Sequence, residues 1–255
     1  MPLTHFVCPD GETIKCEDCL VECRHDSQRL QCPHISTLRN IVERRRPWTG
    51  KPSVTQLLNG TQQAFLEITN DYAVDPDSQV FAEHGTAVHT LIEQDIPRMG
   101  AYGFTGKPDY YDEKDKSLVD FKCAGYYKPA MILGKIPKKD PGEAFFDWEM
   151  QVNAYRVLLE KHGKPVDKMY IHVLVRDGGT FMAKKAGITR RTLWLPIDRM
   201  DDDEVIAYMT TKAAALHTAL EQGFAPICNQ HERWERDRKC KGFCPVSKFC
   251  GNFSA

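Results

Sequence analysis

The 255-residue sequence has no long hydrophobic run and no excess of charge of either sign. No stretch approaches the roughly 18 apolar residues of a membrane-spanning helix. The first six residues also lack the apolar core of a signal peptide. We therefore expect a cytoplasmic protein with no membrane partner. Its length allows one substantial α/β domain with a small appendage.

Many nucleic-acid-binding proteins carry an excess of positive charge. The formal net charge of this chain is −1, so it has no such excess overall. The basic residues are nevertheless clustered, at residues 44–46, 128–139, 184–191 and 233–248. Acidic residues that hold a metal ion can mask such clusters in the total. Composition therefore does not exclude a nucleic-acid ligand.

Cysteine is abundant, with ten residues, nine of them in two groups near the ends of the chain. In a reducing compartment such groups indicate metal or cluster ligation rather than disulfides. The tenth residue, Cys123, is expected to be a small buried hydrophobic side chain.

A β-hairpin is predicted in the middle of the chain. Residues 103–111 and 117–123 have the apolar and aromatic character of strands, and a polar turn separates them. If the turn is centred between Lys114 and Asp115, Asp109 pairs directly with Asp120. Paired residues point to the same face, with Cβ atoms about 4.5–5.5 Å apart.

Two carboxylates at that spacing can share one divalent cation. A bound cation lowers the pKa of its water and makes a nucleophile near neutral pH. Lys122 lies two residues beyond Asp120 and therefore on the same face of the strand. Its ammonium group can orient the water or offset the charge that builds on a phosphate. This combination is typical of phosphodiester hydrolysis.

Helices are predicted on both sides of the hairpin. Residues 144–162 form one, in which Gln151 and Tyr155 lie four residues apart and share a face. A helix over residues 76–94 precedes the hairpin and carries His89.

The other elements complete an α-β-β-α-β-β order. Ser53 is expected to cap a short helix. Two more strands and a long helix are predicted at residues 168–175, 192–197 and 201–222. Residues 128–142 are expected to form a loop over the site, and the segment after Gly178-Gly179 an extended turn.

The motifs Gly106-x-x-Asp109, Asp120-x-Lys122 and Gln151-x-x-x-Tyr155, with a helical histidine before them, resemble the PD-(D/E)xK nuclease superfamily. The branch is that of the RecB-like exonucleases, which include the AddB nuclease domain and the CRISPR-associated adaptation exonuclease. The resemblance covers about residues 53–255. It implies an α/β fold with a restriction-endonuclease-like core, a mixed β-sheet flanked by helices.

The resemblance also implies roles for the site residues. Lys122 would be the catalytic lysine, and Gln151 and Tyr155 would position DNA or the attacking water. The expected ligands of Mg²⁺ or Mn²⁺ are His89, Asp109, Asp120 and the carbonyl of Phe121.

The C-terminal cysteines are Cys228, Cys240, Cys244 and Cys250. One distant and three close cysteines can hold a [4Fe–4S] cluster, and the surrounding residues resemble the end of iron–sulfur RecB-like nucleases. Those proteins take one ligand from an early cysteine near the first helix. Residues 53–65 contain none here, so Cys228 is the expected fourth ligand. Zinc is the alternative, since four thiolates suit it equally.

The N-terminal head, residues 1–36, has too few apolar residues to fold on a core alone, so a structural zinc is expected. Its candidate ligands are five cysteines and two histidines, Cys8, Cys16, Cys19, Cys23, Cys32, His25 and His34. Resemblance to prokaryotic and phage-type nucleases with such a head favours Cys8, Cys19, Cys23 and Cys32. Spacing alone favours the Cys16-x-x-Cys19 pair instead.

Three consecutive segments are therefore expected. These are a Cys-rich head with a basic linker (1–48), a nuclease core (53–223) and an iron–sulfur segment (224–255). The expected function is a Mg²⁺- or Mn²⁺-dependent DNA exonuclease acting on single-stranded ends. Such enzymes contact phosphates more than bases, while Tyr126, Tyr127 and Trp148 are candidates to stack on bases.

The expected partner proteins belong to recombination, phage replication or CRISPR adaptation. One alternative is a catalytically idle nucleic-acid clamp that carries the iron–sulfur and zinc sites. A second is an iron–sulfur electron carrier, which leaves the hairpin acids unexplained.

Overall fold

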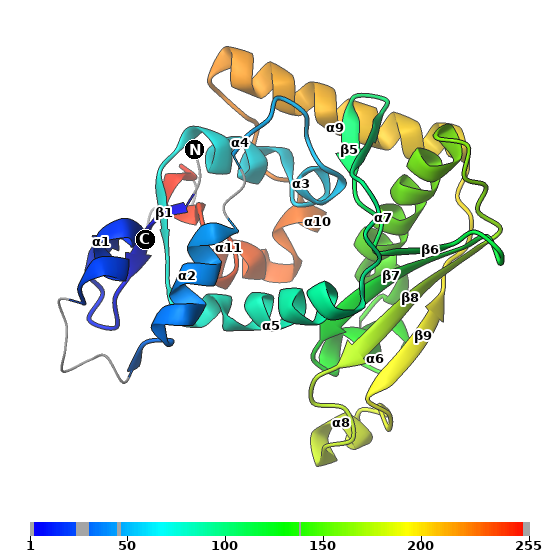
Figure 1. The fold of residues 1–255 in the computed structure, drawn as a ribbon, viewed down its shortest axis with the longest axis horizontal. Coiled ribbons are helices and arrows are strands. Elements are labelled where there is room, and N and C mark those ends of the chain that lie inside the picture. Colours follow the sequence, from blue (N-terminus) through cyan, green and yellow to red (C-terminus); the bar gives the residue numbers. More distant parts are fainter. Residues whose placement is uncertain (1–2, 24–30, 45–46, 138, 252–255) are drawn as a thin grey trace. The chain divides into compact units, whose positions relative to one another are not determined.

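The structure is a computed structural model that describes residues 3–23, 31–44, 47–137 and 139–251. It divides into two compact units, each built from segments that are not consecutive in the sequence (Figure 1). Unit 1 comprises Met1–Gly50, Asn59–Thr86 and Ala214–Ala255, and unit 2 comprises Lys51–Leu58 and Ala87–Ala213. These units differ from the three consecutive segments expected from the sequence.

Unit 2 contains a four-stranded mixed sheet, in the order β6-β7-β8-β9. Its strands are β6 (Tyr110–Asp112), β7 (Ser117–Ala124), β8 (Lys168–Val175) and β9 (Thr192–Pro196). The central pair β7 and β8 is parallel, and both outer pairs are antiparallel. Parallel strands need a long crossover, which the 21-residue helix α7 (Pro141–Lys161) supplies. The expected mixed α/β class is confirmed.

The core of unit 2 follows from strand periodicity. Alternate residues of β8 are buried, namely Met169, Ile171, Val173 and Val175. Helix α7 contacts β7 and β8, and its fully buried Arg156 also ties in helix α9 (Asp202–Gln222). The Arg156 guanidinium lies 2.6 Å from Asp202 Oδ1 and donates to the carbonyl oxygen of Met200 at 3.0 Å.

The predicted strand over residues 103–111 is interrupted, which corrects the expectation. Its first part is β5 (Phe104–Gly106), which pairs with β4 (Met99–Ala101), and its last part is β6. Pro108 lies in the break, where its lack of an N–H fits a position outside the ladder. The register of β6 and β7 is the predicted one, with Tyr110 opposite Val119.

Two expected irregular segments contain short helices. Helix α6 (Tyr127–Ile132) lies within the predicted loop, and α8 (Phe181–Lys185) lies within the predicted turn. The Thr180 hydroxyl accepts a hydrogen bond from the amide of Ala183 and caps α8. A threonine cap followed by good helix formers was the sequence signal for α8.

The helices before the hairpin match the prediction. They are α3 (Val54–Leu58), α4 (Thr61–Thr69) and α5 (Pro76–Ile92). Ser53 Oγ accepts from the amide of Gln56, and the Gln56 side chain accepts from the amide of Ser53. This reciprocal cap fixes the start of α3.

Unit 1 has an apolar cluster in the N-terminal head, which corrects the expectation that the head lacks one. Strand β1 (Leu3–Val7) pairs with β2 (Thr13–Lys15) and runs parallel to β3 (Tyr72–Val74). Helices α1 (Cys16–Val21) and α2 (Ile35–Glu43) complete it. Of its eight buried residues, three lie outside residues 1–36, namely Leu38, Ile41 and Val74.

The C-terminal part of unit 1 contains two short helices and two 3₁₀ turns. They are α10 (Gln230–Arg233), η2 (Glu235–Asp237), α11 (Arg238–Gly242) and η3 (Ser247–Phe249). Within the described residues of both units, no helix combines the length and the apolar character that crossing a bilayer requires.

Candidate active site

Strand β7 and helix α7 bring four of the predicted residues together. Lys122 Nζ lies 2.6 Å from Asp120 Oδ2 and donates to Gln151 Oε1 at 2.8 Å. The Gln151 amide nitrogen donates to Asp120 Oδ1 at 3.3 Å and to the Tyr155 hydroxyl at 3.0 Å. The strand period of two and the helix spacing of four place all of these side chains in one network.

Asp109 occupies the position next to this network. It directly precedes β6, and its Oδ2 accepts a 2.8 Å hydrogen bond from the amide of Phe121. His89, on α5, has its Nδ1 3.5 Å from the same oxygen. The contact that Phe121 makes here uses its amide, and a metal-binding role for its carbonyl stays a prediction.

A further acidic residue, Glu93, joins the site. Ligand atoms of His89, Glu93 and Asp109 all lie within 4.8 Å of one another, the spacing of a metal site. Glu93 is four residues after His89, so the two side chains share one face of the helical turn. Its Oε1 is 2.9 Å from Lys107 Nζ. Sequence reasoning missed Glu93, although the predicted helix over residues 76–94 contained the signal.

Asp120 is the most buried of the acids, with 1% of its surface exposed. Within the described part of the chain, its Oδ2 accepts no well-directed hydrogen bond, although Lys122 Nζ is close. Burial raises the pKa of Asp120, Lys122 opposes that rise, and the charge of Asp109 adds to it. A buried carboxylate oxygen in this state fits a divalent cation, which would favour the ionised form.

The neighbouring groups respond to the same charges. The hydrogen bond to Asp109 raises the pKa of His89, and burial opposes this. Burial and the Asp120 charge both raise the pKa of Tyr155, so Tyr155 stays a protonated phenol. A metal bound by His89 would compete with the ring proton, because a ligating imidazole is neutral.

Close packing of β5 against α7 depends on Gly106. A Cβ atom at this position would lie 2.8 Å from Leu158 Cδ1 and 2.8 Å from Tyr155 Cδ1. The glycine of the Gly106-x-x-Asp109 motif thus lets the backbone approach the helix that carries Gln151. This packing fixes where the segment leading to Asp109 begins.

The other predicted aromatic residues lie in or next to two helices. Tyr126 directly precedes α6, Tyr127 begins α6, and Trp148 is on α7. Tyr127 is 38% exposed, and the amide of Tyr126 donates to Asp177 Oδ1 at 2.7 Å. Trp148 lies under Lys128, whose Nζ is 5.4 Å from the ring centroid.

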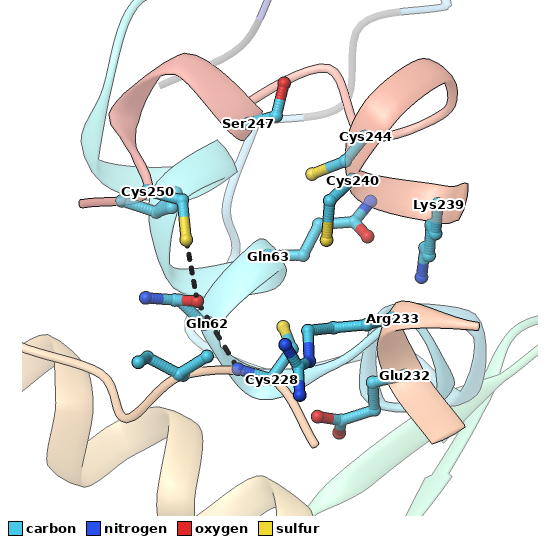
Figure 2. Close-up of a pocket in the computed structure, with 12 residues that line it drawn as sticks. Gln62, Gln63, Cys228, Glu232, Arg233, Lys239, Cys240, Cys244, Ser247 and Cys250 are labelled. Atoms are coloured by element: carbon cyan, nitrogen blue, oxygen red, sulfur yellow. Dashed lines mark hydrogen bonds between the residues drawn. The ribbon is translucent and has the colours of Figure 1, made fainter. Parts of the chain in front are cut away.

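The four C-terminal cysteines of unit 1 line one small cavity (Figure 2). Cys228 comes before α10, Cys240 lies on α11, and Cys244 and Cys250 flank η3. Gln62 of α4 lies between Cys228 and Cys250, and its Oε1 accepts from the Cys228 amide at 3.4 Å and from Cys250 Sγ at 3.3 Å.

A buried lysine accompanies these cysteines. Lys239 is 8% exposed and donates to the carbonyl oxygen of Asn59 at 2.7 Å. Burial raises the pKa of the Cys244 thiol to about 11, and the positive charge of Lys239 acts to lower it. A metal ion or cluster bound to these thiols would stabilise their thiolate forms.

The head cysteines also form a group. The pKa of Cys19 is raised to about 11, mainly by burial and then by the charges of Cys32, Cys23 and Cys8, with Cys16 contributing least. Cys16 is completely buried in the apolar cluster. Among the described residues, no three cysteine sulfurs in either group lie within 4.8 Å of one another.

Of the two head histidines, the structure describes His34. His34 caps α2, its ring nitrogen accepting from the Ser36 amide at 3.3 Å. His25 lies outside the described residues.

Comparisons with known proteins add a single distant likeness. No protein-family model matches the sequence, and no curated protein matches it. A solved structure described as a phage related exonuclease from Haemophilus somnus 129PT matches part of the chain, at 16% identity and a TM-score of 0.35. The match covers 57% of this chain and 67% of that one. At this similarity it identifies no family, and the functional argument depends on the site itself.

Proposed function

We propose that the protein is a metal-dependent nuclease of the PD-(D/E)xK type. The observation that carries the proposal is the grouping of Asp120 and Lys122 on β7 with Asp109 just before β6, and with His89 and Glu93 beside Asp109. Acidic, imidazole and ammonium groups in this arrangement suit phosphodiester hydrolysis.

The metal-binding roles follow from the donor set. The carboxylates of Asp109 and Asp120, with the imidazole of His89, would hold Mg²⁺ or Mn²⁺, and Glu93 adds a ligand close to them. The carbonyl of Phe121 is a further candidate. A bound cation supplies a water of lowered pKa and neutralises charge on the phosphate.

The remaining side chains position the reacting groups. Lys122 is oriented by Asp120 and Gln151 and supplies positive charge where the phosphate becomes more negative. Gln151 links Lys122, Asp120 and Tyr155, so it holds the network in one geometry. Tyr155 keeps its phenol proton, so its hydroxyl can donate a hydrogen bond within the site.

We infer DNA with single-stranded ends as the substrate and exonucleolytic cleavage as the activity. Clustered basic residues in a chain of net charge −1 support a nucleic-acid backbone as the ligand. The partner proteins would belong to recombination, phage replication or CRISPR adaptation.

A [4Fe–4S] cluster is the group we propose for Cys228, Cys240, Cys244 and Cys250. One distant and three close cysteines suit such a cluster, and all four line one cavity.

For the head we propose a structural Zn²⁺ held by Cys8, Cys19, Cys23 and Cys32. The ranking of charges around Cys19 supports this set. The complete burial of Cys16 also supports it over the Cys16-x-x-Cys19 pair.

The function is tested by anaerobic purification, metal analysis and an assay on labelled single- and double-stranded DNA with and without EDTA. We expect cleavage that EDTA stops. Asp109→Ala, Asp120→Ala and Lys122→Ala should each reduce cleavage by about a hundredfold or more while DNA binding persists. Full activity in either aspartate variant would contradict the site. DNA binding without cleavage by the metal-loaded protein would favour the idle clamp.

A further inference from the structure

The connection between β8 and β9, residues 176–191, differs in character from the rest of the chain. It contains five basic residues and one acidic residue, whereas the whole chain has a net charge of −1. Lys184, Lys185, Arg190 and Arg191 are all exposed. The connection therefore presents a local positive charge in unit 2.

The apolar side chains of this connection are distributed in an unusual way. Its two largest, Phe181 and Met182, are 78% and 53% exposed, whereas Ala183 and Ile188 are buried beneath them. A segment folded only for its own stability would bury the phenylalanine, since burial of that side chain is worth about 1.5–3 kcal/mol. Exposed aromatic surface among positive charges marks a binding surface.

The backbone of the connection is held in place. The Val175 amide donates to the Arg191 carbonyl at 2.7 Å, and Lys135 Nζ donates to the Gly187 carbonyl at 2.7 Å. At Gly178 a Cβ atom would lie 2.6 Å from the Arg190 carbonyl oxygen, so only glycine allows this approach. Phe181 is thus exposed on a segment whose backbone is fixed by hydrogen bonds and close packing.

The connection begins where the catalytic strand ends. Strands β7 and β8 are parallel, with Lys122 opposite Val173 and Ala124 opposite Val175. The Arg176 amide then donates to the Ala124 carbonyl at 3.0 Å. In Figure 1, α8 lies at the end of the sheet where β8 leads out and β9 returns. A nucleic acid that reaches Lys122 can extend toward this end.

We propose that residues 176–191 form a second nucleic-acid contact, in which the exposed lysines and arginines bind backbone phosphates and Phe181 stacks on a base at the junction of duplex and single strand. This inference rests on the proposed nuclease function and deepens it. Cationic side chains match the charge of phosphates. An aromatic ring matches any base, because every base has a stacking face. A base inside a duplex is already stacked on its neighbours, so the ring requires an unpaired base, and the substrate class is DNA with a single-stranded segment.

Two variants of the full-length protein separate the two kinds of contact. Binding is measured by fluorescence anisotropy in EDTA, on a labelled hairpin with a single-stranded tail and on a labelled single strand. Phe181→Ser with Met182→Ser should weaken binding to the tailed hairpin by about fivefold or more. Phe181→Tyr, which keeps the ring, should retain wild-type affinity.

The charge contacts are tested through salt dependence. Lys184→Glu with Lys185→Glu should weaken binding to both DNAs and reduce the slope of log K against log salt by about 1.4 to 1.8. The matched control is Lys114→Glu with Lys116→Glu, the same charge change in the β6–β7 turn at the opposite end of β7. That control should leave the slope within about 0.5 of wild type.

Unchanged affinities and slopes in both test variants would overturn the proposal. So would a change in sedimentation of the Phe181/Met182 variant without a change in DNA binding, because the surface would then be a protein interface. Wild-type protein that binds neither DNA would count against the nuclease function itself. DNA binding and cleavage that do not depend on residues 176–191 would leave that function standing.

Discussion

At the scale of single residues, the site depends on side chains whose partners come from distant parts of the sequence. The strand period was enough to predict that Asp120 and Lys122 share one face, and the helix period that Gln151 and Tyr155 do, because each rule concerns residues on one element. That the two faces meet was implied only by the family resemblance. The same rules did not reveal the ion pair of Glu93 with Lys107, since it joins the end of a helix to a loop. Nor did they predict the burial of Asp120.

The metal ligands give the first residue-scale prediction. His89→Ala and Glu93→Gln should each raise the Mn²⁺ concentration needed for half-maximal cleavage by about tenfold or more. The first removes a proposed ligand atom, and the second removes the negative charge of a proposed ligand. A cleavage assay against Mn²⁺ concentration measures this. Lys107→Met is the control, and it should cause no such rise, because it removes only the ammonium that competes for Glu93. An unchanged titration for His89→Ala would assign that histidine to helix packing.

Gly106 gives the second residue-scale prediction. Gly106→Ala should lower the free energy of unfolding by about 1–3 kcal/mol, because the new methyl group would overlap Leu158 and Tyr155. Urea unfolding followed by circular dichroism measures the effect. Gly100→Ala is the control in the paired strand, where the nearest side-chain atom would be 3.4 Å away. Equal stabilities for the two variants would contradict the prediction and would show that the side chains of α7 move to accommodate the methyl group.

At the scale of elements, the sequence predicted long and regular pieces best. Strand β8 has its predicted bounds, and α7, α9 and β9 differ from prediction by one to three residues at an end. The predicted length was wrong for the strand over residues 103–111. Pro108 lacks an N–H donor, and the residues on its two sides belong to different sheets. Helices α6 and α8, of six and five residues, were missed, whereas the equally short α3 was predicted from its Ser53 cap.

The start of α7 gives the element-scale prediction. Asp140 Oδ1 accepts from the amides of Gly142 and Glu143, at 2.8 and 3.3 Å. Asp140→Ala should therefore lower the free energy of unfolding by about 1 kcal/mol. Asp140→Asn, which can still accept, should lose much less. Thermal or urea unfolding compares the two, and the prediction is wrong if alanine and asparagine are equivalent.

At the scale of the whole molecule, the order of elements was predictable, but the division into units was not. Strand β1 pairs with β3, so Leu3 lies opposite Tyr72. Nothing local in either segment specifies a partner so far along the chain. The apolar cluster of the head likewise draws on α2 and β3, which is why counting apolar residues within 1–36 underestimated it.

The two cysteine groups give the whole-molecule prediction. Cys240→Ala with Cys244→Ala should remove iron and bleach a brown protein. Cys19→Ala with Cys23→Ala should release zinc and leave the colour, because these thiols belong to the head. Absorption spectra and metal analysis of anaerobically purified protein measure both. Iron loss with zinc retained in the Cys19/Cys23 variant would contradict this division of the cysteines.

The interleaving of the two units also sets an order of events during synthesis. The last residue of unit 2 is Ala213, and every C-terminal cysteine follows it. The ribosome therefore releases β7, which carries Asp120 and Lys122, before the cysteine cavity is complete. If the proposed cluster fills that cavity, a cell starved of iron accumulates chains with a formed β6-β7-β8-β9 sheet and an open C-terminal segment, which limited proteolysis would cut after residue 213.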